Sequence, residues 1–251
     1  MFSIFYDVED SSFIAGNQQS EASWLAFMKD NTPLLGANVL DIGCGNGTFS
    51  QLMAIGGAQM VTGLDYSIPS LLGALNRTGR TINLQFVQGD ARDIQFCENT
   101  FDLVVMRAML HQMTTLSEWI DEAFRVLKPN GTIVIQDRTP EDVLAKGNQR
   151  HFNGYLFEQF PQLAEQDILH HTSSQDVQTT LRGSGFVCVQ ELPYWEPVRV
   201  YHGVEAVRLE LKKRAMECSD SSWIDEMCMK FNNDTYITEM IPWTFWTAQV
   251  G

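Results

Sequence analysis

The sequence predicts an α/β fold built on an open, mostly parallel sheet, and three observations carry this prediction. Apolar runs too short for a helix recur between helix-like segments from residue 36 to residue 137. The runs are apolar on both faces, as strands buried in a parallel sheet are. Strand-like and helix-like segments alternate regularly, which is typical of right-handed β-α-β crossovers.

Five strands and three helices are predicted in this region. The segment 67–79 illustrates the helices, because Ser67 is a suitable N-cap, Pro69 lies in the first turn and Gly79 follows the end. The other two helices are expected at 47–55 and 115–127. The strands are NVLDIG (38–43), QMVTGLDYS (59–67), INLQFVQGD (82–90), FDLVVMR (101–107) and GTIVIQD (131–137).

The alternation breaks after Asp137. Residues 138–172 form an aromatic-rich insertion that is predicted to be helical, and a helix at 173–186 leads into a sixth strand at 187–195. Two amphipathic helices follow at 202–216 and 219–231, and the alternating segment 242–250 reads as a strand antiparallel to the sixth. The predicted fold is a Rossmann-like, doubly wound, mostly parallel seven-stranded sheet with the last strand antiparallel, plus helical cap insertions.

Composition excludes several classes of protein. The 251 residues are 44% hydrophobic and 19% charged, which is an ordinary globular composition. A net charge of -14 disfavours nucleic acid and other polyanions as partners, and the basic run Lys212–Arg214 is best explained as a solvated helix face. No apolar run or secretory signal indicates a membrane partner or export. The five cysteines are scattered without CxxC spacing, which predicts a reducing cytoplasm and no metal site.

A glycine-rich turn follows the first predicted strand, in DIGCGNG. Gly43, Gly45 and Gly47 lie at the carboxyl edge of the sheet, where ligands bind in open α/β folds. Glycine lets a ligand touch the main chain. The spacing G-x-G-x-G differs from the G-x-G-x-x-G of dinucleotide sites, because Thr48 stands at the third glycine position.

Three aspartates distinguish between candidate ligands. Asp41 ends the first strand, where its carboxylate would repel a pyrophosphate but attract the sulfonium and ammonium groups of S-adenosylmethionine (SAM). Asp65 ends the second strand and could accept hydrogen bonds from both ribose hydroxyls, as an acid at this place also does in NAD sites. Asp90 ends the third strand and could accept a hydrogen bond from the adenine amino group. Three strands ending in aspartate at one edge favour SAM over NAD.

These segments resemble the class I SAM-dependent methyltransferases of the small-molecule group. The resemblance lies in VLDIGCGNGTFS, GLDYS, VQGDARDI, FDLVVMRAMLHQM and AFRVLKPNGTIVIQD, and covers roughly residues 36 to 140. It implies that SAM is the cofactor, with S-adenosylhomocysteine (SAH) as the product. It also implies a set of cofactor-lining residues: Tyr6, Asp41, Gly43, Gly45, Asp65, Tyr66, Asp90, Ala91 and Arg107.

The expected organisation is one domain over residues 1–251. It comprises an N-terminal helical lid segment (1–35), the cofactor-binding core (36–137) and cap insertions over the active site (138–172 and 196–240).

Two residues are candidates for catalysis. His111 follows the fourth strand at the ligand edge and could accept a proton near neutral pH, or it could position the cofactor or pack the loop. Asp137 ends the fifth strand at the same edge, where it could meet the substrate or make a loop-start hydrogen bond. Methyl transfer from a sulfonium needs little more than alignment of the nucleophile and removal of its proton.

The insertions should determine the acceptor. Their aromatic residues could enclose a small, partly apolar molecule, or they could simply pack the cap. The expected function is methylation of such a molecule. The alternatives are a SAM- or SAH-binding regulatory module without turnover, an RNA or protein methyltransferase, and a NAD-dependent oxidoreductase. The sequence leaves the acceptor atom and the oligomeric state open, with a homodimer as one option.

Overall fold

The computed structural model describes residues 11–113, 115–214, 222–231 and 235–251. The chain divides into two compact units. One unit, called here the core unit, comprises Leu25–Thr139, His171–Tyr194 and Trp243–Gly251. The other, called the insert unit, comprises the described part of Met1–Trp24 together with Pro140–His170 and Trp195–Pro242.

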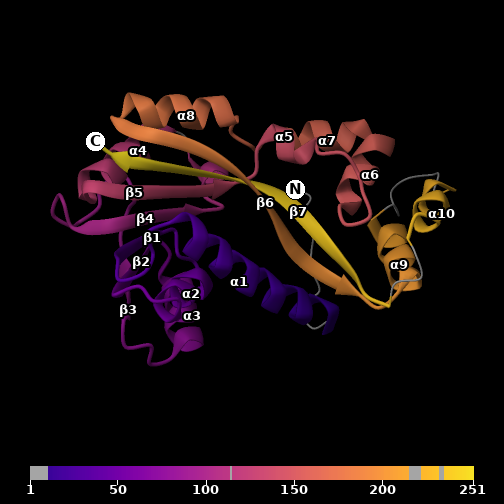
Figure 1. Ribbon diagram of the computed structural model, residues 1–251, viewed down its shortest axis with the longest axis horizontal. Coiled ribbons are helices and arrows are strands. Elements are labelled where there is room, and N and C mark those ends of the chain that lie inside the picture. Colours follow the sequence, from indigo (N-terminus) through magenta and orange to yellow (C-terminus); the bar gives the residue numbers. More distant parts are fainter. Residues whose placement is uncertain (1–10, 114, 215–221, 232–234) are drawn as a thin grey trace. The chain divides into compact units, whose positions relative to one another are not determined.

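A seven-stranded sheet with the order β3-β2-β1-β4-β5-β7-β6 organises the fold (Figure 1). The pairs β1–β2, β1–β4, β2–β3 and β4–β5 are parallel, whereas β7 is antiparallel to β5. The predicted fold class is therefore confirmed. The strands are β1 Asn38–Ile42, β2 Met60–Asp65, β3 Leu84–Gln88, β4 Phe101–Arg107, β5 Leu127–Asp137, β6 Phe186–Tyr201 and β7 Ile237–Val250.

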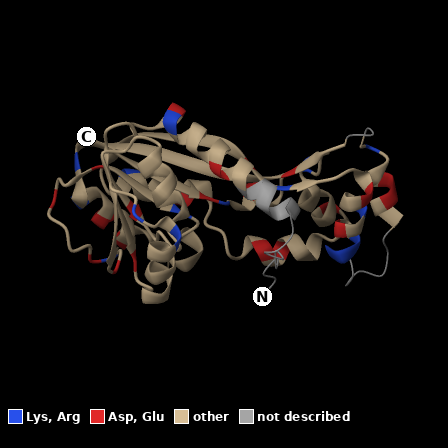
Figure 2. Cartoon of the chain, turned by 90° about the horizontal axis from the view of Figure 1, so that it is seen from below, with Lys and Arg blue, Asp and Glu red and all other residues tan. Residues whose placement is uncertain are grey.

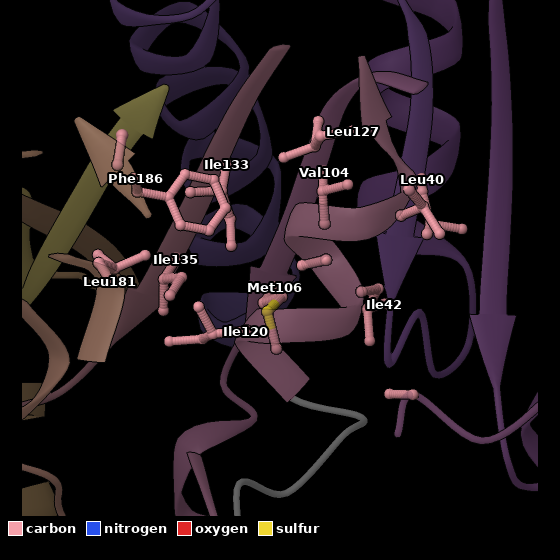
Figure 3. Close-up of a cluster of buried hydrophobic side chains, with 14 of the residues drawn as sticks. Leu40, Ile42, Val104, Met106, Ile120, Leu127, Ile133, Ile135, Leu181 and Phe186 are labelled. Atoms are coloured by element: carbon pink, nitrogen blue, oxygen red, sulfur yellow. The ribbon is translucent and has the colours of Figure 1, made fainter. Parts of the chain in front are cut away.

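Helices cover both faces of the sheet in the core unit. On one face α4 (Leu116–Val126) and α8 (Ser174–Gly183) lie side by side. Figure 3 shows their apolar side chains meeting alternate residues of the strands, with Leu40 and Ile42 from β1 and Val104 and Met106 from β4. Because side chains alternate along a strand, Asp41 points to the opposite face. That face carries α2 (Thr48–Ile55) and α3 (Ile68–Thr78).

The helix boundaries in the core unit follow the local signals. Ser67 caps α3, because its Oγ accepts from the Ser70 N–H at 3.3 Å, and Gly79 follows the helix with φ 58°. Helix α8 begins after Ser173, whose side chain accepts from the Asp176 N–H, and ends at Gly183. Helix α1 (Ser11–Asn31) belongs partly to each unit.

Three strands are longer than predicted. Strand β5 begins at Leu127 rather than 131, because the KPNG segment (128–131) joins the sheet through a register shift. Asn130 there adopts φ 62°. Strands β6 and β7 extend to Tyr201 and back to Ile237, so both contribute to the insert unit as well. In contrast, β3 ends at Gln88, which leaves Asp90 in the following loop.

The insert unit has its own hydrophobic core. Its helices are α5 Pro140–Val143, α6 Phe152–Gln159, α7 Pro161–Ile168, α9 Val204–Arg214 and α10 Ser222–Cys228. Phe152, Tyr155, Phe160 and Trp223, which were candidates for lining an acceptor pocket, take part in this core with Tyr201 and Ile224. For these four residues the alternative expectation, that they pack the cap, is confirmed.

Charged positions of both signs are interspersed along the described chain (Figure 2). The basic run at the end of α9 was expected to form one solvated face, but it does not. Lys212 and Lys213 are exposed, but the Arg214 side chain is only 9% exposed and pairs with Glu239. Among the described residues, no helix is long and apolar enough to cross a membrane.

Candidate cofactor site

The loop between β1 and α2 carries the glycines at the carboxyl edge of the sheet. Gly43 has φ 72°, and a Cβ there would overlap the Met109 side chain. Gly45 has φ 53°, and a Cβ there would point into open space. The absence of a side chain at Gly43 therefore allows Met109 to pack against the loop. At Gly45 it leaves the main chain open to contact by a ligand.

Those two glycines border a cavity of about 720 Å³ in the core unit. The size falls within the range of small-molecule and cofactor sites. Eight of the nine predicted cofactor residues line it: Asp41, Gly43, Gly45, Asp65, Tyr66, Asp90, Ala91 and Arg107. The ninth, Tyr6, lies outside the described residues, and its role stays a prediction.

Asp41 forms a buried part of the cavity wall. The residue is 3% exposed, and its Oδ2 accepts a hydrogen bond from the Ser50 hydroxyl at 2.5 Å. Burial raises the pKa of Asp41 to about 7, against the opposing influence of the Ser50 bond and of Arg107. Proton uptake by this carboxyl therefore occurs near neutral pH.

Asp65 is held by two backbone amides. Its Oδ2 accepts from the Gly45 N–H and its Oδ1 from the Ser67 N–H, each at 2.8 Å. These bonds tie the glycine loop to the start of α3 and fix the plane of the carboxylate. Each oxygen has a second acceptor site, so the group can still accept from a ligand. Tyr66 beside it is 77% exposed.

Asp90 is paired within its own loop. Its carboxylate accepts from the Arg92 Nε and Nη2, the shortest contact being 2.7 Å, and from the Arg92 N–H at 2.9 Å. These contacts hold the pKa of Asp90 below its usual value. Arg92 also lines the cavity, as does the buried Ala91. A ligand that uses Asp90 must share it with this arginine.

Arg107 ends β4 between two aromatic rings. Its guanidinium carbon lies 3.9 Å from the centroid of Phe49 and 5.1 Å from that of Trp243. Cation–π contacts at these distances orient the guanidinium. The cavity thus combines one stacked cation with the acidic side chains Asp41 and Asp65.

The two candidates for catalysis lie apart from the cavity lining. His111 is exposed on the short helix η1 (Leu110–Gln112), with its Nε2 3.3 Å from the Gln112 amide nitrogen. Asp137 is buried and accepts from the Leu110 N–H and the Arg138 N–H, each at 2.8 Å. Asp137 therefore makes the loop-start hydrogen bonds that were one of its two expected roles. A catalytic role for either residue stays a prediction.

Contributors to the site that were not anticipated include Ser50, Phe49, Arg92 and Met109. Ser50 lies three residues after Gly47, one turn into α2, and that spacing is a signal that could have indicated a partner for Asp41. Arg92 follows Asp90 by two residues, as in an Asx-type turn. Among the described residues, no group of His, Cys, Asp and Glu side chains is arranged to hold a metal ion.

A family model described as a methyltransferase domain matches residues 35–185, which is more than half of the chain. The chain belongs to the class I SAM-dependent methyltransferase family. The match begins just before β1 and ends just before β6, so it includes every residue that lines the cavity.

A curated relative is similar in sequence, and two solved structures share the fold. A demethylmenaquinone methyltransferase from Clavibacter sepedonicus is 34% identical over 131 residues, which are 52% of this chain and 52% of that protein. The chain thus spans about half the length of the curated relatives it matches. A SAM-dependent methyltransferase structure from Mesorhizobium loti has a TM-score of 0.55 at 19% identity, covering 93% of this chain and 99% of that one. Phosphoethanolamine N-methyltransferase 2 from Haemonchus contortus has a TM-score of 0.58 at 19% identity, covering 96% and 55%.

Proposed function

We propose that this chain binds SAM in the cavity at the carboxyl edge of the sheet and transfers its methyl group to a small, partly apolar molecule. The observation that carries the proposal is the combination of Gly45, open to the cavity, with the carboxylates of Asp41 and Asp65 in its wall. Acidic side chains attract a sulfonium ligand and oppose a pyrophosphate. Membership of the family supports the same cofactor.

The residues of the cavity divide between the parts of the cofactor. Asp65 would accept from the ribose hydroxyls, for which its two fixed oxygens are suited. Asp90 and Ala91 would meet the adenine, and Asp41 and Arg107 would meet the charged methionine end. When bound, SAM supplies a methyl group on a sulfur that is already an excellent leaving group, so the chain itself need only align the acceptor and exclude water.

A proton must be removed where the acceptor carries one at the attacking atom. His111 is the candidate base, because its imidazole is exposed on η1 and histidine is the side chain that most often serves as a general base. Asp137 would act indirectly, by holding Leu110 and hence η1 in place. A His111→Ala variant should then lose turnover while keeping its affinity for SAH.

One relative supports a class of acceptor. The protein from Clavibacter sepedonicus is a demethylmenaquinone methyltransferase, so a demethylmenaquinone analogue is the first acceptor to test. The net charge of -14 supports a small neutral or cationic acceptor over RNA.

A cytoplasmic location accords with the free thiols of Cys44, Cys97, Cys188 and Cys228.

Calorimetric titration tests the cofactor assignment. SAH should bind with micromolar affinity and NAD should give no signal. Turnover with the quinone analogue would then test transfer, with methylated product detected by mass. SAH binding without turnover on any acceptor would favour a binding module. Binding of NAD in place of SAH would overturn the proposal.

A further inference from the structure

A long stretch of the core unit is nearly free of charge. Residues 31–89 include two acidic residues, Asp41 and Asp65, and both line the cofactor cavity. The basic residues of this stretch are Arg77 and Arg80, and both are exposed. Since the whole chain has a net charge of -14, the surface that this stretch forms outside the cavity differs from the rest of the protein in its charge.

The outer face of α3 is apolar. Ile68, Leu72 and Leu75 are each more than half exposed, and their spacing of four and three residues places them on one side of the helix. On the opposite side, Leu71 and Ala74 are buried where α3 packs on β2 and β3. A helix that is apolar on both sides is typical of one that is covered on both, and exposed apolar patches often mark an interaction site.

Three loops at the amino edge of the sheet extend this apolar surface. They precede β1, β2 and β3, which are parallel and therefore begin at the same edge. Leu35 in the first loop is 86% exposed, Ile55 at the start of the second is 65% exposed, and Ile82 in the third is 98% exposed. Because α3 ends at Thr78, just before the third loop, its outer face leads to this edge. These three residues and the three exposed residues of α3 are called here the apolar face.

Hydrogen bonds hold the three loops beside one another. The Gly36 N–H donates to the Gly57 carbonyl at 2.8 Å, which joins the first loop to the second. The Asn83 side-chain amide donates to the carbonyls of Ala54 and Ala58 at 3.0 and 2.9 Å, which joins the third loop to the second. The exposed apolar side chains of the loops are therefore presented by a fixed framework.

The shape and charge of the apolar face suit a lipid surface better than a protein. Its side chains project singly from a helix and from loops, and a fluid bilayer accepts such side chains without the matching recesses that a protein interface requires. Arg77 and Arg80 lie at the end of α3, where each can reach a lipid phosphate while its stem rests on apolar surface. Anionic headgroups repel the acidic remainder of the chain, so they favour contact through this face.

We propose that the apolar face, with Arg77 and Arg80, binds peripherally to a membrane that contains anionic lipid. The inference goes beyond the proposed function, and no residue of the apolar face lines the cofactor cavity. The expectation of no membrane partner was based on the length of apolar runs. Such runs do not detect this surface, because its side chains come from separate segments of the chain.

Flotation of the full chain with lipid vesicles tests the proposal. One preparation is phosphatidylcholine alone, and the other is phosphatidylcholine mixed with the anionic phosphatidylglycerol. The wild type should float with the mixed vesicles and should partition more weakly into the neutral ones, by roughly fivefold for each arginine that contacts the surface.

Matched variants assign the binding to the apolar face. Leu72→Gln and Ile82→Gln should each lower the partition by about tenfold, because each removes an apolar side chain that would enter the bilayer. Leu169→Gln is the control, since Leu169 is 83% exposed but belongs to the insert unit. Arg80→Gln should weaken binding to the mixed vesicles, whereas Lys213→Gln, which removes the same charge from an exposed position in the insert unit, should not.

Circular dichroism and SAH titration accompany each variant. Both should match the wild type, because none of these residues lines the cavity. Failure of the wild type to float with either vesicle would overturn the proposal, as would equal partition of Leu72→Gln and Leu169→Gln. A dimer in vesicle-free buffer that Leu72→Gln dissociates would assign the apolar face to a second copy of the chain and would also overturn it. SAH binding is measured separately, so these results leave the cofactor proposal as it stands.

Discussion

Asp65 is the acidic side chain whose role in cofactor affinity is easiest to isolate. Its carboxylate is oriented by the Gly45 and Ser67 amides and retains free acceptor positions. We expect Asp65→Ala to weaken SAH binding by at least the value of one charge-assisted hydrogen bond, about 1.5–3 kcal/mol, or roughly 10- to 150-fold. Asp65→Asn should lose less, because its amide oxygen still accepts. Calorimetry on both variants, with circular dichroism to verify folding, measures this, and an unchanged SAH affinity would contradict the ribose assignment.

Asp41 should also influence the stability of the protein without ligand. Its pKa is raised from 3.8 to about 7 by burial, so the folded state favours the protonated form and stability is lost as pH rises through this interval. At about 1.4 kcal/mol per pH unit, the loss amounts to roughly 4 kcal/mol by pH 8. Asp41→Asn should therefore unfold at higher denaturant concentration than wild type at pH 8 and at a similar concentration near pH 4. A variant less stable than wild type at pH 8 would show that the ionised carboxylate is favoured in the fold.

Single residues mark the limit of what the sequence predicts. The position of the three aspartates at one edge followed from the strand pattern, because strand ends in a parallel sheet are set by topology. The pairing of Asp90 with Arg92 and of Asp41 with Ser50 was not predicted. The local spacings are compatible with both bonds, but they do not determine which side chains meet, because that depends on side-chain geometry. The stacking of Arg107 between Phe49 and Trp243 joins residues from three separate segments.

The glycine loop belongs to the scale of elements, since it connects β1 to α2. Gly45→Ala should lose about 1–2 kcal/mol of stability from its positive φ and should also lose SAH affinity, by about tenfold or more, because the added methyl enters the cavity. Gly36→Ala is the matched control. Gly36 has φ 74° and open space at its Cβ, but it does not line the cavity.

Thermal unfolding and SAH titration of both variants distinguish the two effects. Both variants should be destabilised to a similar extent, and only Gly45→Ala should bind more weakly. Equal SAH affinity of the two would show that no ligand approaches the main chain at Gly45.

Element types were predictable, whereas several element ends were not. Ser67 and Gly79 delimit α3 as expected, because caps and glycines act within one turn of the chain. The start of β5 was misplaced, because Asn130 adopts a left-handed conformation that lets KPNG enter the sheet. Strands β6 and β7 are neighbours in the sheet, and their extensions beyond the core unit pair with each other. This pairing joins residues far apart in the sequence, so local sequence signals do not predict it.

At the scale of the whole molecule, the insert unit is fixed by a buried ion pair. The Arg214 guanidinium donates to both oxygens of Glu239, at 2.6 and 2.8 Å, and the Tyr201 hydroxyl donates to Glu239 as well. Glu239 is 1% exposed. Burial acts to raise the pKa of Glu239, but Arg214 and Tyr201 outweigh it and hold the pKa below the usual value. The pair therefore stabilises the unit at neutral pH, and the stabilisation is lost as the pH falls below the ordinary glutamate range.

Glu239→Gln should destabilise the protein by up to about 3–5 kcal/mol, because it leaves a buried guanidinium charge uncompensated by its main partner. Glu205→Gln is the control, since Glu205 pairs with Arg208 at 3.3 Å but its side chain is 84% exposed. That change should stay within about 0.5 kcal/mol. Hydrogen exchange of the insert unit at neutral pH measures both, and equal protection in the two variants would contradict the importance of the buried pair.

The core unit was largely predictable as a whole, and the insert unit was not. A repeating strand–helix order and buried apolar strands specify the sheet before any contact is known. The insert unit is assembled from three separated segments, and its interior contains Arg214, Glu239 and Asn153 beside the aromatic residues. Buried polar groups of this kind are unrecognisable in a sequence until their partners are known.

The strand order has a consequence for the order of folding. Strand β7 lies between β5 and β6, although β6 ends at Tyr201 and β7 begins only at Ile237. During synthesis β5 and β6 must therefore wait for a strand that follows after the intervening helices. Both present unpaired edges in the meantime, and such edges can pair with another chain. Because β7 pairs with β5 across a long stretch of sequence, we expect its insertion to be a late step in the completion of this sheet.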